Sequence, residues 1–446
     1  MLEKNREMIK LRKIFTLLLF ALLFSTCFTT NTKFDKLMPG TLRGELFLDE
    51  SNVPVGDFSK IGNSRDIASD QAFTDGVLPF NFEVTYDAHD SMTITFINGA
   101  QRIPVKEILW GRNLSNARDT IRIQFVEYDT YIRAETEHGI ISGAWYIPRK
   151  NISIPFRALA GKDYRFANLL DTPKYDISGK WSAIFSPDED PDTTVGEFKQ
   201  NGNLITGTFM STTGDYGFLE GGARNERFSL SSFDGGHAFL FTGKFINADN
   251  IEGAFMSGKT YKTTWKGNRN QHAVLPDATS LVKSVTDTPI HFSFPDDNNQ
   301  MVSVDDPEIK NKIKVVQVMG TWCPNCKDET EFITTYMRDN PSKEIQFLAL
   351  TFEAYDDSVK VNRLISNYKK KMQMTYLVLW TGKANAKDAS DKLPFLSKVM
   401  AFPTLLILDK NNSIRYVHTG FSGPATSEYN HFKKEFSQVI HQISNQ

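Results

Sequence analysis

The stretch Val315–Cys326, which reads VVQVMGTWCPNC, decides the fold predicted for the C-terminal part of this chain. An apolar, largely β-branched run ends at Gly320, and two cysteines follow with two residues between them. The polar residues after Cys326 pass into a helical pattern that places Phe332 and Tyr336 on one side. The stretch therefore predicts a strand, a sharp turn and a Cys-x-x-Cys pair that opens a helix, an arrangement typical of a redox site.

The position of the first cysteine has a chemical consequence. The start of a helix carries free N–H groups and the positive end of the helix dipole, and both stabilise a thiolate at Cys323. An ordinary cysteine, with a pKa of about 8.5, is only about 3 % thiolate at pH 7. Since the thiolate is the nucleophile, the helix start favours reactivity at this cysteine.

Length and charge limit the classes of function. A chain of 446 residues exceeds one ordinary hydrophobic core, so we expect two or three domains. A net charge of −2 without a dominant basic patch argues against a nucleic acid as partner and against binding to a charged membrane surface. The 34 phenylalanines and 28 glycines suit a β-rich protein with many tight turns.

Cysteine usage indicates a single redox pair. The three cysteines are Cys27, Cys323 and Cys326, and the first lies in an N-terminal targeting segment. One remaining pair is too few for a disulfide-stapled secreted scaffold. A structural zinc site needs a second pair of Cys or His at ligand spacing, and none of the eight histidines is so placed. We therefore expect no metal and no cofactor.

The N-terminus reads as an export signal over residues 1–27. A basic segment, residues 1–13, precedes the apolar run Ile14–Phe24, which is shorter than the ~20 residues that span a bilayer. Residues 24–27 resemble a bacterial lipoprotein box, although Leu is usual at the place of Phe24 and Ala or Gly at that of Thr26. Two outcomes stay open: Cys27 is lipidated and anchors the protein to a membrane, or it is removed by ordinary cleavage. Either outcome predicts a protein of the cell envelope, in the periplasm.

Residues 40–270 alternate with a period of two, as β-strands do. Strands are predicted at Leu78–Tyr86, Met92–Ile97 and Ile121–Tyr128. A hairpin pattern with glycine in mid-strand occurs at residues 141–145, 205–209 and 251–255, which predicts close backbone approach or a bulge. Unequal spacing of the copies argues against a solenoid or propeller. We predict an antiparallel sandwich or barrel, in two halves at residues 40–173 and 174–270.

Two polar clusters interrupt this β region. Gly214–Tyr216 and Ser231–His237 contain the Asp and Gly residues that turns between strands require. We expect both clusters to be structural turns, and the β region to have no chemistry of its own.

A linker at residues 271–289 leads into an α/β domain at residues 290–446. Alternating strands and helices, then a hairpin and a last helix, predict a mixed central sheet flanked by helices. The predicted strands are Ile313–Met319, Ile345–Phe352, Tyr376–Trp380, Thr404–Asp409 and Ile414–His418; the predicted helices are Cys323–Arg338, Val359–Lys371, Asp388–Met400 and Ser427–Ile443.

From about residue 290 onward the chain resembles a thiol–disulfide oxidoreductase of the TlpA/ResA type, within the thioredoxin-like superfamily. Four features support the resemblance: the motif Trp-Cys-Pro-Asn-Cys at residues 322–326, Glu329 three residues beyond it, Ala-Phe-Pro-Thr at residues 401–404, and a long segment before that proline. The β region resembles, more loosely, the N-terminal β domain fused to some of these proteins. The resemblance implies a thioredoxin-like fold for residues 290–446.

The resemblance also implies a role for each site residue. Cys323 attacks a substrate disulfide and Cys326 resolves the mixed disulfide. Glu329 exchanges a proton with the second thiol, Pro403 in cis exposes backbone for an extended substrate segment, and Trp322 shields one side. The alternatives are an exposed early-helix acid for Glu329 and a packed aromatic for Trp322. The implied partners are protein thiols and disulfides and a membrane electron donor.

Three functions follow from these features. The first is an exported thiol–disulfide oxidoreductase that reduces disulfides of envelope proteins through its Cys-Pro-Asn-Cys dithiol. The second is a thiol peroxidase of the redoxin type, although its Pro-x-x-x-Thr-x-x-Cys setting is missing. The third is an envelope binding module with an accessory redoxin domain. We expect no chemistry at His418, which ends a predicted strand.

Overall fold

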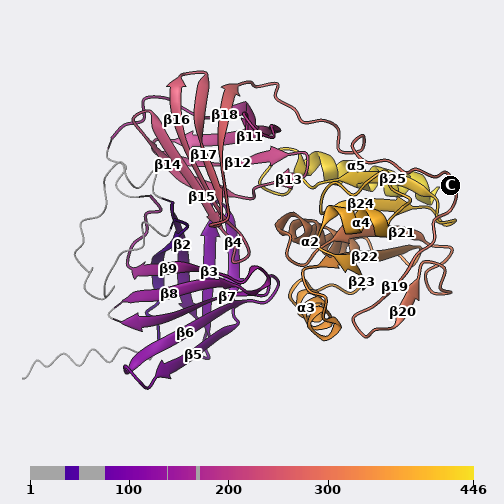
Figure 1. Ribbon diagram of the computed structural model, residues 1–446, viewed down its shortest axis with the longest axis horizontal. Helices are drawn as coiled ribbons and strands as arrows, with labels where there is room; N and C mark the ends of the chain where they lie inside the picture. Colours follow the sequence, from indigo (N-terminus) through magenta and orange to yellow (C-terminus); the bar gives the residue numbers. More distant parts are fainter. Residues whose placement is uncertain (1–35, 50–75, 138, 167–170, 446) are drawn as a thin grey trace, which may run out of the picture. The chain divides into compact units, whose positions relative to one another are not determined.

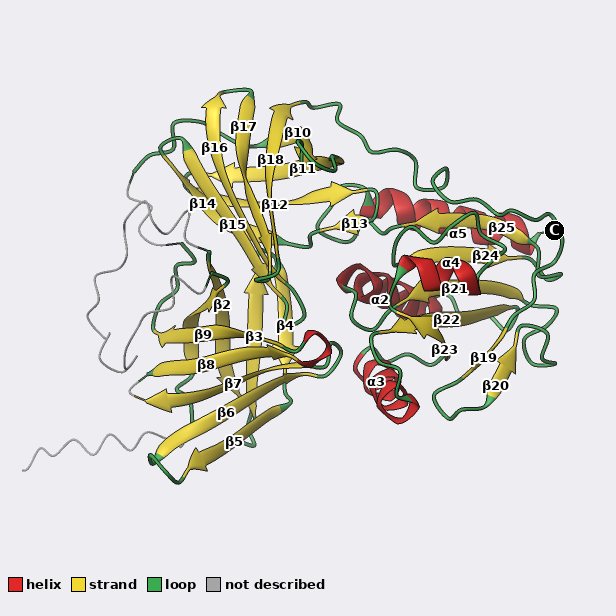
Figure 2. Cartoon of the chain, in the orientation of Figure 1, coloured by secondary structure: helices red, strands yellow, loops and turns green. Residues whose placement is uncertain are grey.

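The computed structural model describes residues 36–49, 76–137, 139–166 and 171–445. The predicted export signal and Cys27 lie outside these residues. The described part holds two nine-stranded sheets, a five-stranded sheet and a two-stranded sheet (Figure 1). Figure 2 shows that strands dominate the first part of the chain and that the α-helices belong to the last part. Among the described residues, none of the helices has the length and apolar character needed to cross a bilayer.

The first sheet is antiparallel, and its first and last strands in the chain, β1 and β9, pair with each other in its interior. Its strands run in the order β4-β3-β2-β1-β9-β8-β7-β6-β5, so that β4 and β5 form its edges. The sheet comprises β1 Gly40–Phe47, β2 Val77–Tyr86, β3 Met92–Asn98, β4 Gln101–Val105, β5 Ile108–Asn113, β6 Arg118–Phe125, β7 Thr130–Glu137, β8 Ile140–Ile147 and β9 Ile152–Ala160, with a short 3-10 turn, η4 Pro148–Lys150.

The second sheet closes on itself. The pairing of β11 with β12 joins its two ends, so that β10, β11, β12 and β14 to β18 form a continuous antiparallel ring, to which β13 adds an outer hairpin arm. A closed barrel leaves no unpaired edge along the ring. Its strands are β10 Gly179–Phe185, β11 Asp192–Asn201, β12 Leu204–Ser211, β13 Gly214–Asp215, β14 Leu219–Arg224, β15 Arg227–Phe233, β16 Ala238–Asn247, β17 Asn250–Ser257 and β18 Tyr261–Arg269.

Aromatic side chains fill both β halves. The barrel interior is a packed core whose largest members are Trp181, Phe209, Phe228, Phe241 and Trp265. Phe233 of β15 extends into the first sheet, where its ring lies 4.6 Å from that of Phe80 and 5.0 Å from that of Trp145. Such aromatic pairs stabilise a core beyond the area they bury. The fold class predicted for this region, an antiparallel β barrel or sandwich, is confirmed.

The mid-strand glycines lie where another backbone passes closely. A Cβ atom at Gly143 would lie 2.1 Å from the carbonyl oxygen of Arg133. At Gly207 it would lie 2.2 Å from that of Glu197, and at Gly253 it would lie 1.9 Å from that of Thr242. No side chain fits at such distances. The repeated glycine therefore reflects close approach of neighbouring strands, as the sequence pattern indicates.

The C-terminal domain is a mixed sheet with helices. The strand order is β23-β22-β21-β24-β25; β21, β22 and β23 are parallel, and β24 and β25 are antiparallel to β21 and to each other. The elements are β21 Ile313–Met319, α2 Pro324–Asp339, β22 Ile345–Glu353, α3 Ser358–Lys371, β23 Leu377–Lys383, α4 Ala386–Lys392, β24 Thr404–Leu408, β25 Ile414–Thr419 and α5 Tyr429–Ser444, preceded by the hairpin β19 Ser293–Pro295 and β20 Met301–Ser303.

Strand β21 is buried on both faces. Val315 and Met319 contribute to a core formed with helices α2, α3 and α5. Val316 and Val318 contribute to the opposite core, which includes Ala389 of α4. The alternation of side chains along a strand explains the division. It also places Gln317 on the same face as Val315 and Met319, beneath α2.

Two predicted elements need correction. The helix predicted at Asp388–Met400 ends at Lys392, because Pro394 lacks an N–H group and its ring disfavours helical backbone at Leu393. The strand predicted at Ile121–Tyr128 ends at Phe125 and is followed by a turn. The predicted linker, residues 271–289, forms no helix or strand, and Val282 within it is buried in the C-terminal core. Residues Pro39–Gln446 form one compact unit.

Candidate active site

Cys323 lies at the N-cap of α2, directly after the turn that ends β21. Its backbone is extended, and its Sγ accepts a hydrogen bond from the N–H of Cys326 at 3.2 Å. Pro324 follows at the first helical position, where the missing N–H removes no helical hydrogen bond. The Sγ also lies 3.3 Å from the carbonyl oxygen of Phe402, to which its thiol donates. The helix start thus presents an N–H donor to the sulfur, as a thiolate requires.

Cys326 is the deeper of the two thiols. It is 0 % exposed, whereas Cys323 is 3 % exposed, and both are free thiols. Burial, together with the adjacent Cys323 sulfur, raises the pKa of Cys326 well above the usual thiol value. Cys326 therefore needs a proton acceptor before it can act as a nucleophile.

Glu329 lies one helical turn beyond Cys326 and is also 0 % exposed. Burial raises its pKa to about 8, and the amide of Gln317 opposes that rise. Neither carboxylate oxygen has a hydrogen-bond partner among the described residues. The alternative of an exposed early-helix acid is therefore wrong. A buried carboxyl with a raised pKa is suited to exchange protons near neutral pH.

A buried polar network lies behind Cys326, and it was not predicted from the sequence. Gln317 donates from Nε2 to the carbonyl oxygen of Cys326 at 3.2 Å, and Thr330 donates to the same oxygen at 2.8 Å. The Oγ1 of Thr330 lies 3.1 Å from Oε1 of Gln317, and Tyr368 contacts Thr330 at 3.3 Å. The sign of this network in the sequence was Gln317, an amide side chain within a largely apolar strand. These contacts hold the first turn of α2 against β21.

The proline segment lies against the first cysteine. The Phe402–Pro403 peptide bond is cis, as the resemblance implies. The carbonyl oxygen of Phe402 faces the Cys323 thiol, and that of Pro403 accepts a hydrogen bond from the N–H of Gly420 at 2.9 Å. Ala401, on the other side, is buried. The backbone expected to receive a substrate segment is thus largely covered in this conformation.

Trp322, directly before Cys323, is held in place by two contacts. Its Nε1 donates to the carbonyl oxygen of Phe352 at 2.9 Å, and its ring meets that of Phe402 edge-on at 5.6 Å. The adjacent Thr321 donates from its N–H and its hydroxyl to the carboxylate of Glu353, at 3.0 Å and 2.7 Å. Glu353 is buried, and burial raises its pKa despite these bonds. It fixes the turn before Cys323, and the sequence did not single it out.

The two polar clusters of the β region border the redox helix. A cavity of about 30 Å³ is enclosed by Asp215, Asp234 and His237 from the β region and by Asn325 and Asp328 from the start of α2, among others. The sequence predicted only structural turns there. The signal was weak, because Asp and Gly occur in turns of every kind.

Asp328 and Asp215 both line this cavity. Burial raises the pKa of Asp328 to about 8; Lys327 lowers it, while the charge of Asp215 raises it. Burial raises the pKa of Asp215 to about 6, although Asp215 accepts hydrogen bonds from the N–H groups of Gly423 and Gly217. Asp328, near the start of α2, therefore favours the protonated form at pH 7.

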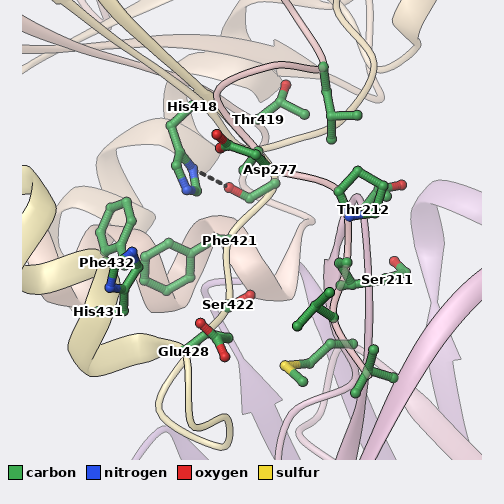
Figure 3. Close-up of a pocket in the computed structure, with 18 of the residues that line it drawn as sticks. Ser211, Thr212, Asp277, His418, Thr419, Phe421, Ser422, Glu428, His431 and Phe432 are labelled. Carbon is green, nitrogen blue, oxygen red and sulfur yellow. Dashed lines mark hydrogen bonds between the residues drawn. The ribbon is translucent and has the colours of Figure 1, made fainter. Parts of the chain in front are cut away.

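A larger cavity, of about 310 Å³, lies beside β25 and α5 (Figure 3). Its wall includes His418, which is held by a contact of 3.1 Å between Nδ1 and the carbonyl oxygen of Gly420 and packs against Phe432. Burial lowers the pKa of His418 to about 4, so the ring is neutral at pH 7. Across the described residues, no group of three or more His, Cys, Asp or Glu side chains could hold a metal ion.

A dithiol at the first turn of a helix, on a thioredoxin-like sheet and beside a cis-proline, defines a thiol–disulfide oxidoreductase domain. Residues 275–432, the redoxin-like part of the chain, match the sequence model of the Redoxin family. Comparison with the curated proteins finds no match.

Several solved structures are similar to part of the chain. A thiol-disulfide oxidoreductase from Bacteroides fragilis NCTC 9343 is 15% identical, covers 34% of this chain and 98% of its own, and has a TM-score of 0.25. A putative thiol:disulfide interchange protein DsbE from Chlorobium tepidum is 16% identical, with coverage of 34% and 96% and a TM-score of 0.27. A putative thiol-disulfide oxidoreductase from Bacteroides vulgatus is 21% identical, with coverage of 36% and 93% and a TM-score of 0.26.

Proposed function

We propose that this protein is an exported thiol–disulfide oxidoreductase that reduces disulfides of other envelope proteins with Cys323 and Cys326. The observation that carries the proposal is the N-cap position of Cys323, whose sulfur accepts the N–H of Cys326 at 3.2 Å. A sulfur held in this way is stabilised as a thiolate, the form that attacks disulfides.

In the first step the Cys323 thiolate attacks one sulfur of a substrate disulfide. A bond forms between Cys323 Sγ and that sulfur while the substrate S–S bond breaks. The second substrate sulfur leaves as a thiolate and takes a proton from solvent. The product is a mixed disulfide between Cys323 and the substrate.

In the second step Cys326 resolves the mixed disulfide. Its thiol gives its proton to the Glu329 carboxylate and attacks Cys323 Sγ, which releases the second substrate thiolate. With a pKa of about 8, Glu329 is ionised in about a tenth of the molecules at pH 7. Its raised pKa lies nearer to that of the buried thiol than an ordinary carboxyl's would, which favours the transfer.

The cycle leaves a Cys323–Cys326 disulfide and a substrate reduced by two electrons. A dithiol donor must return those electrons by the same exchange chemistry, and we place that donor in the membrane, since an exported protein is separated from cytoplasmic reductants. The pattern of residues 1–27 supports export, and Cys27 would supply a lipid anchor if it is lipidated.

The reduction potential of the Cys323–Cys326 pair, measured against glutathione, tests the proposal. Thioredoxin-like sites range from about −270 to about −120 mV, and we expect a value near the reducing end. Cys323→Ser should abolish reduction of a protein disulfide. A potential near −180 mV or above would contradict the reductase direction, and direct peroxide turnover would favour a thiol peroxidase instead.

A further inference from the structure

Cys323 is poorly accessible to a protein disulfide in this conformation. Only 3 % of its surface is exposed, and Ala401 and Pro403 beside it are buried as well. Thiol–disulfide exchange requires the substrate sulfur to reach the attacking Sγ. A part of the protein must therefore move before a bulky substrate reacts.

The hairpin of β12 and β13 contacts two segments that flank the dithiol. A Cβ atom at Gly214 would lie 2.0 Å from Nδ2 of Asn325, which stands between the two cysteines. A Cβ atom at Gly420 would lie 2.7 Å from the carbonyl oxygen of Thr212. The hairpin thus packs directly on the Cys-Pro-Asn-Cys turn and on the loop after β25, with no space for a substrate between them.

Asp215 fastens the hairpin to that loop. Its Oδ2 accepts a hydrogen bond from the N–H of Gly423, and its Oδ1 accepts one from the N–H of Gly217 at 2.6 Å. The carboxylate therefore orders its own turn and ties it to the redoxin domain at the same time.

The β region and the redoxin domain also share an apolar contact, of Leu275 with the cluster of Val195 and Met210, and several polar ones, including the ion pair of Lys371 with Glu107 at 3.3 Å. Ser427 donates to Glu197 from its N–H at 2.9 Å and from its hydroxyl at 2.6 Å. Tyr355 donates to Asp129 at 2.9 Å. Polar contacts of this kind are common between domains of one chain that move relative to each other.

We propose that the β12–β13 hairpin, held by Asp215 on Gly423 and by Gly214 on Asn325, decides which substrates reach Cys323. Small disulfides react after a slight opening, whereas protein disulfides must displace the hairpin from the redox turn. The β region is then the specificity element of the oxidoreductase. The inference rests on the proposed function only for its substrate class, because the occlusion of Cys323 is a property of the structure.

The test compares two maleimides of different size on the reduced full-length protein. N-ethylmaleimide and a polyethylene glycol maleimide share the same chemistry, and tandem mass spectrometry of the peptide that contains both Cys323 and Cys326 assigns each label to one of the two cysteines. The ratio of the bulky to the small labelling rate measures opening. We expect Asp215→Ala to raise this ratio about tenfold, because the variant loses the hydrogen bonds from the N–H groups of Gly423 and Gly217.

Four further variants keep the test decisive. Glu197→Ala should raise the ratio less than Asp215→Ala, and Asp215→Asn, which keeps an oxygen acceptor, should remain close to the wild type. The matched control is Asp249→Ala, which removes an exposed carboxylate at 3.6 Å from Arg269 on the barrel and should change nothing. If Asp215→Ala does not fold, Glu197→Ala and Ser427→Ala decide the question.

Substrate reduction gives the second measurement. In Asp215→Ala, kcat/KM for insulin should rise several-fold relative to kcat/KM for hydroxyethyl disulfide. Equal labelling ratios in folded Asp215→Ala, Glu197→Ala and wild-type protein would overturn the inference. Slow labelling of Cys323 even by N-ethylmaleimide in every variant would count against the proposed function, while the ratio would still report on the hairpin.

Discussion

Among single residues, Glu329 departs most from what is usual for a carboxyl at its position in a helix. It lies in the second turn of a helix, where acids are usually solvated, yet it is fully buried beside Cys326 and Gln317. Its pKa of about 8 results from burial, with only the Gln317 amide opposing it. The energetic consequence is that the folded protein holds a proton that the unfolded chain releases near pH 4.

Glu329→Gln should slow the step in which Cys326 resolves a mixed disulfide. Loss of a general base costs about 10²-fold or more, and the rate of release of a substrate trapped on Cys323 measures it. The control is Glu331→Gln, on the same helix, which removes an exposed partner of Lys327. An unchanged resolution rate in Glu329→Gln would exclude the proton-transfer role.

Glu329→Gln should also change how the free energy of unfolding depends on pH. Because the folded-state pKa of Glu329 is raised, its stabilising contribution is complete below the unfolded pKa of about 4.3 and is lost as pH rises toward 8. The free energy of unfolding of the wild type should therefore fall relative to Glu329→Gln between about pH 4 and pH 8. Urea unfolding at several pH values measures the difference.

At the scale of elements, glycine and proline decide where strands approach and where helices stop. Pro394 ends α4 at Lys392, eight residues before the end that the sequence pattern had predicted at Met400. Gly143, Gly207 and Gly253 allow the backbone of a neighbouring strand to pass within contact distance. Both effects arise from the backbone itself, so no side-chain pattern overrides them.

Gly207→Ala should therefore destabilise the barrel. Its new Cβ would lie 2.2 Å from the carbonyl oxygen of Glu197 and 2.5 Å from the ring of Phe198, which forces a backbone shift. We expect a loss of about 3 kcal/mol or more, at the upper end for overpacked cores. The control is Gly111→Ala in β5, where the nearest atom is Oγ1 of Thr120 at 3.1 Å. Equal unfolding midpoints for the two variants would contradict the close-approach argument.

At the scale of the whole molecule, carboxyls gather where the β region meets the redox helix. Asp215 and Asp328 both have raised pKa values there, of about 6 and about 8. The groups that face this pair are Lys327 and Glu331 from α2, Asp234, His237 and Tyr128 from the β region, and Tyr429 from α5. The closed arrangement thus favours protonated carboxyls, and an open one would release the protons.

The closed position of the β12–β13 hairpin on the redox turn should consequently become less stable as pH rises. Exposed aspartates titrate near pH 3.9, so the closed state keeps its extra protons between about pH 4 and pH 8 and loses stability relative to the open state across that window. The ratio of bulky to small maleimide labelling at Cys323 should rise from pH 5 to pH 8. Asp328→Asn should flatten this rise, with Asp249→Asn as control. A steep rise that persists in Asp328→Asn would assign the pH dependence to another group.

The sequence by itself determined the C-terminal fold and its redox centre. The strands of Val315 and Ile345, the helix after Cys323 and the α/β order follow from local hydrophobic periodicity, and the Cys-x-x-Cys spacing places both thiols in one helical turn. The glycine pattern likewise indicated close strand approach in the β region. These features depend on residues that are near one another in the chain.

Only the tertiary structure decided what surrounds that centre. Three features join residues from separate elements. They are the burial of Glu329, the hydrogen bond of Gln317 to the carbonyl oxygen of Cys326, and the hydrogen bond from the N–H of Gly423 to Asp215. Their effects arise from desolvation and from hydrogen bonds across long chain separations, which no local pattern encodes. The sequence therefore specifies the dithiol, and the tertiary structure decides which side chains surround it.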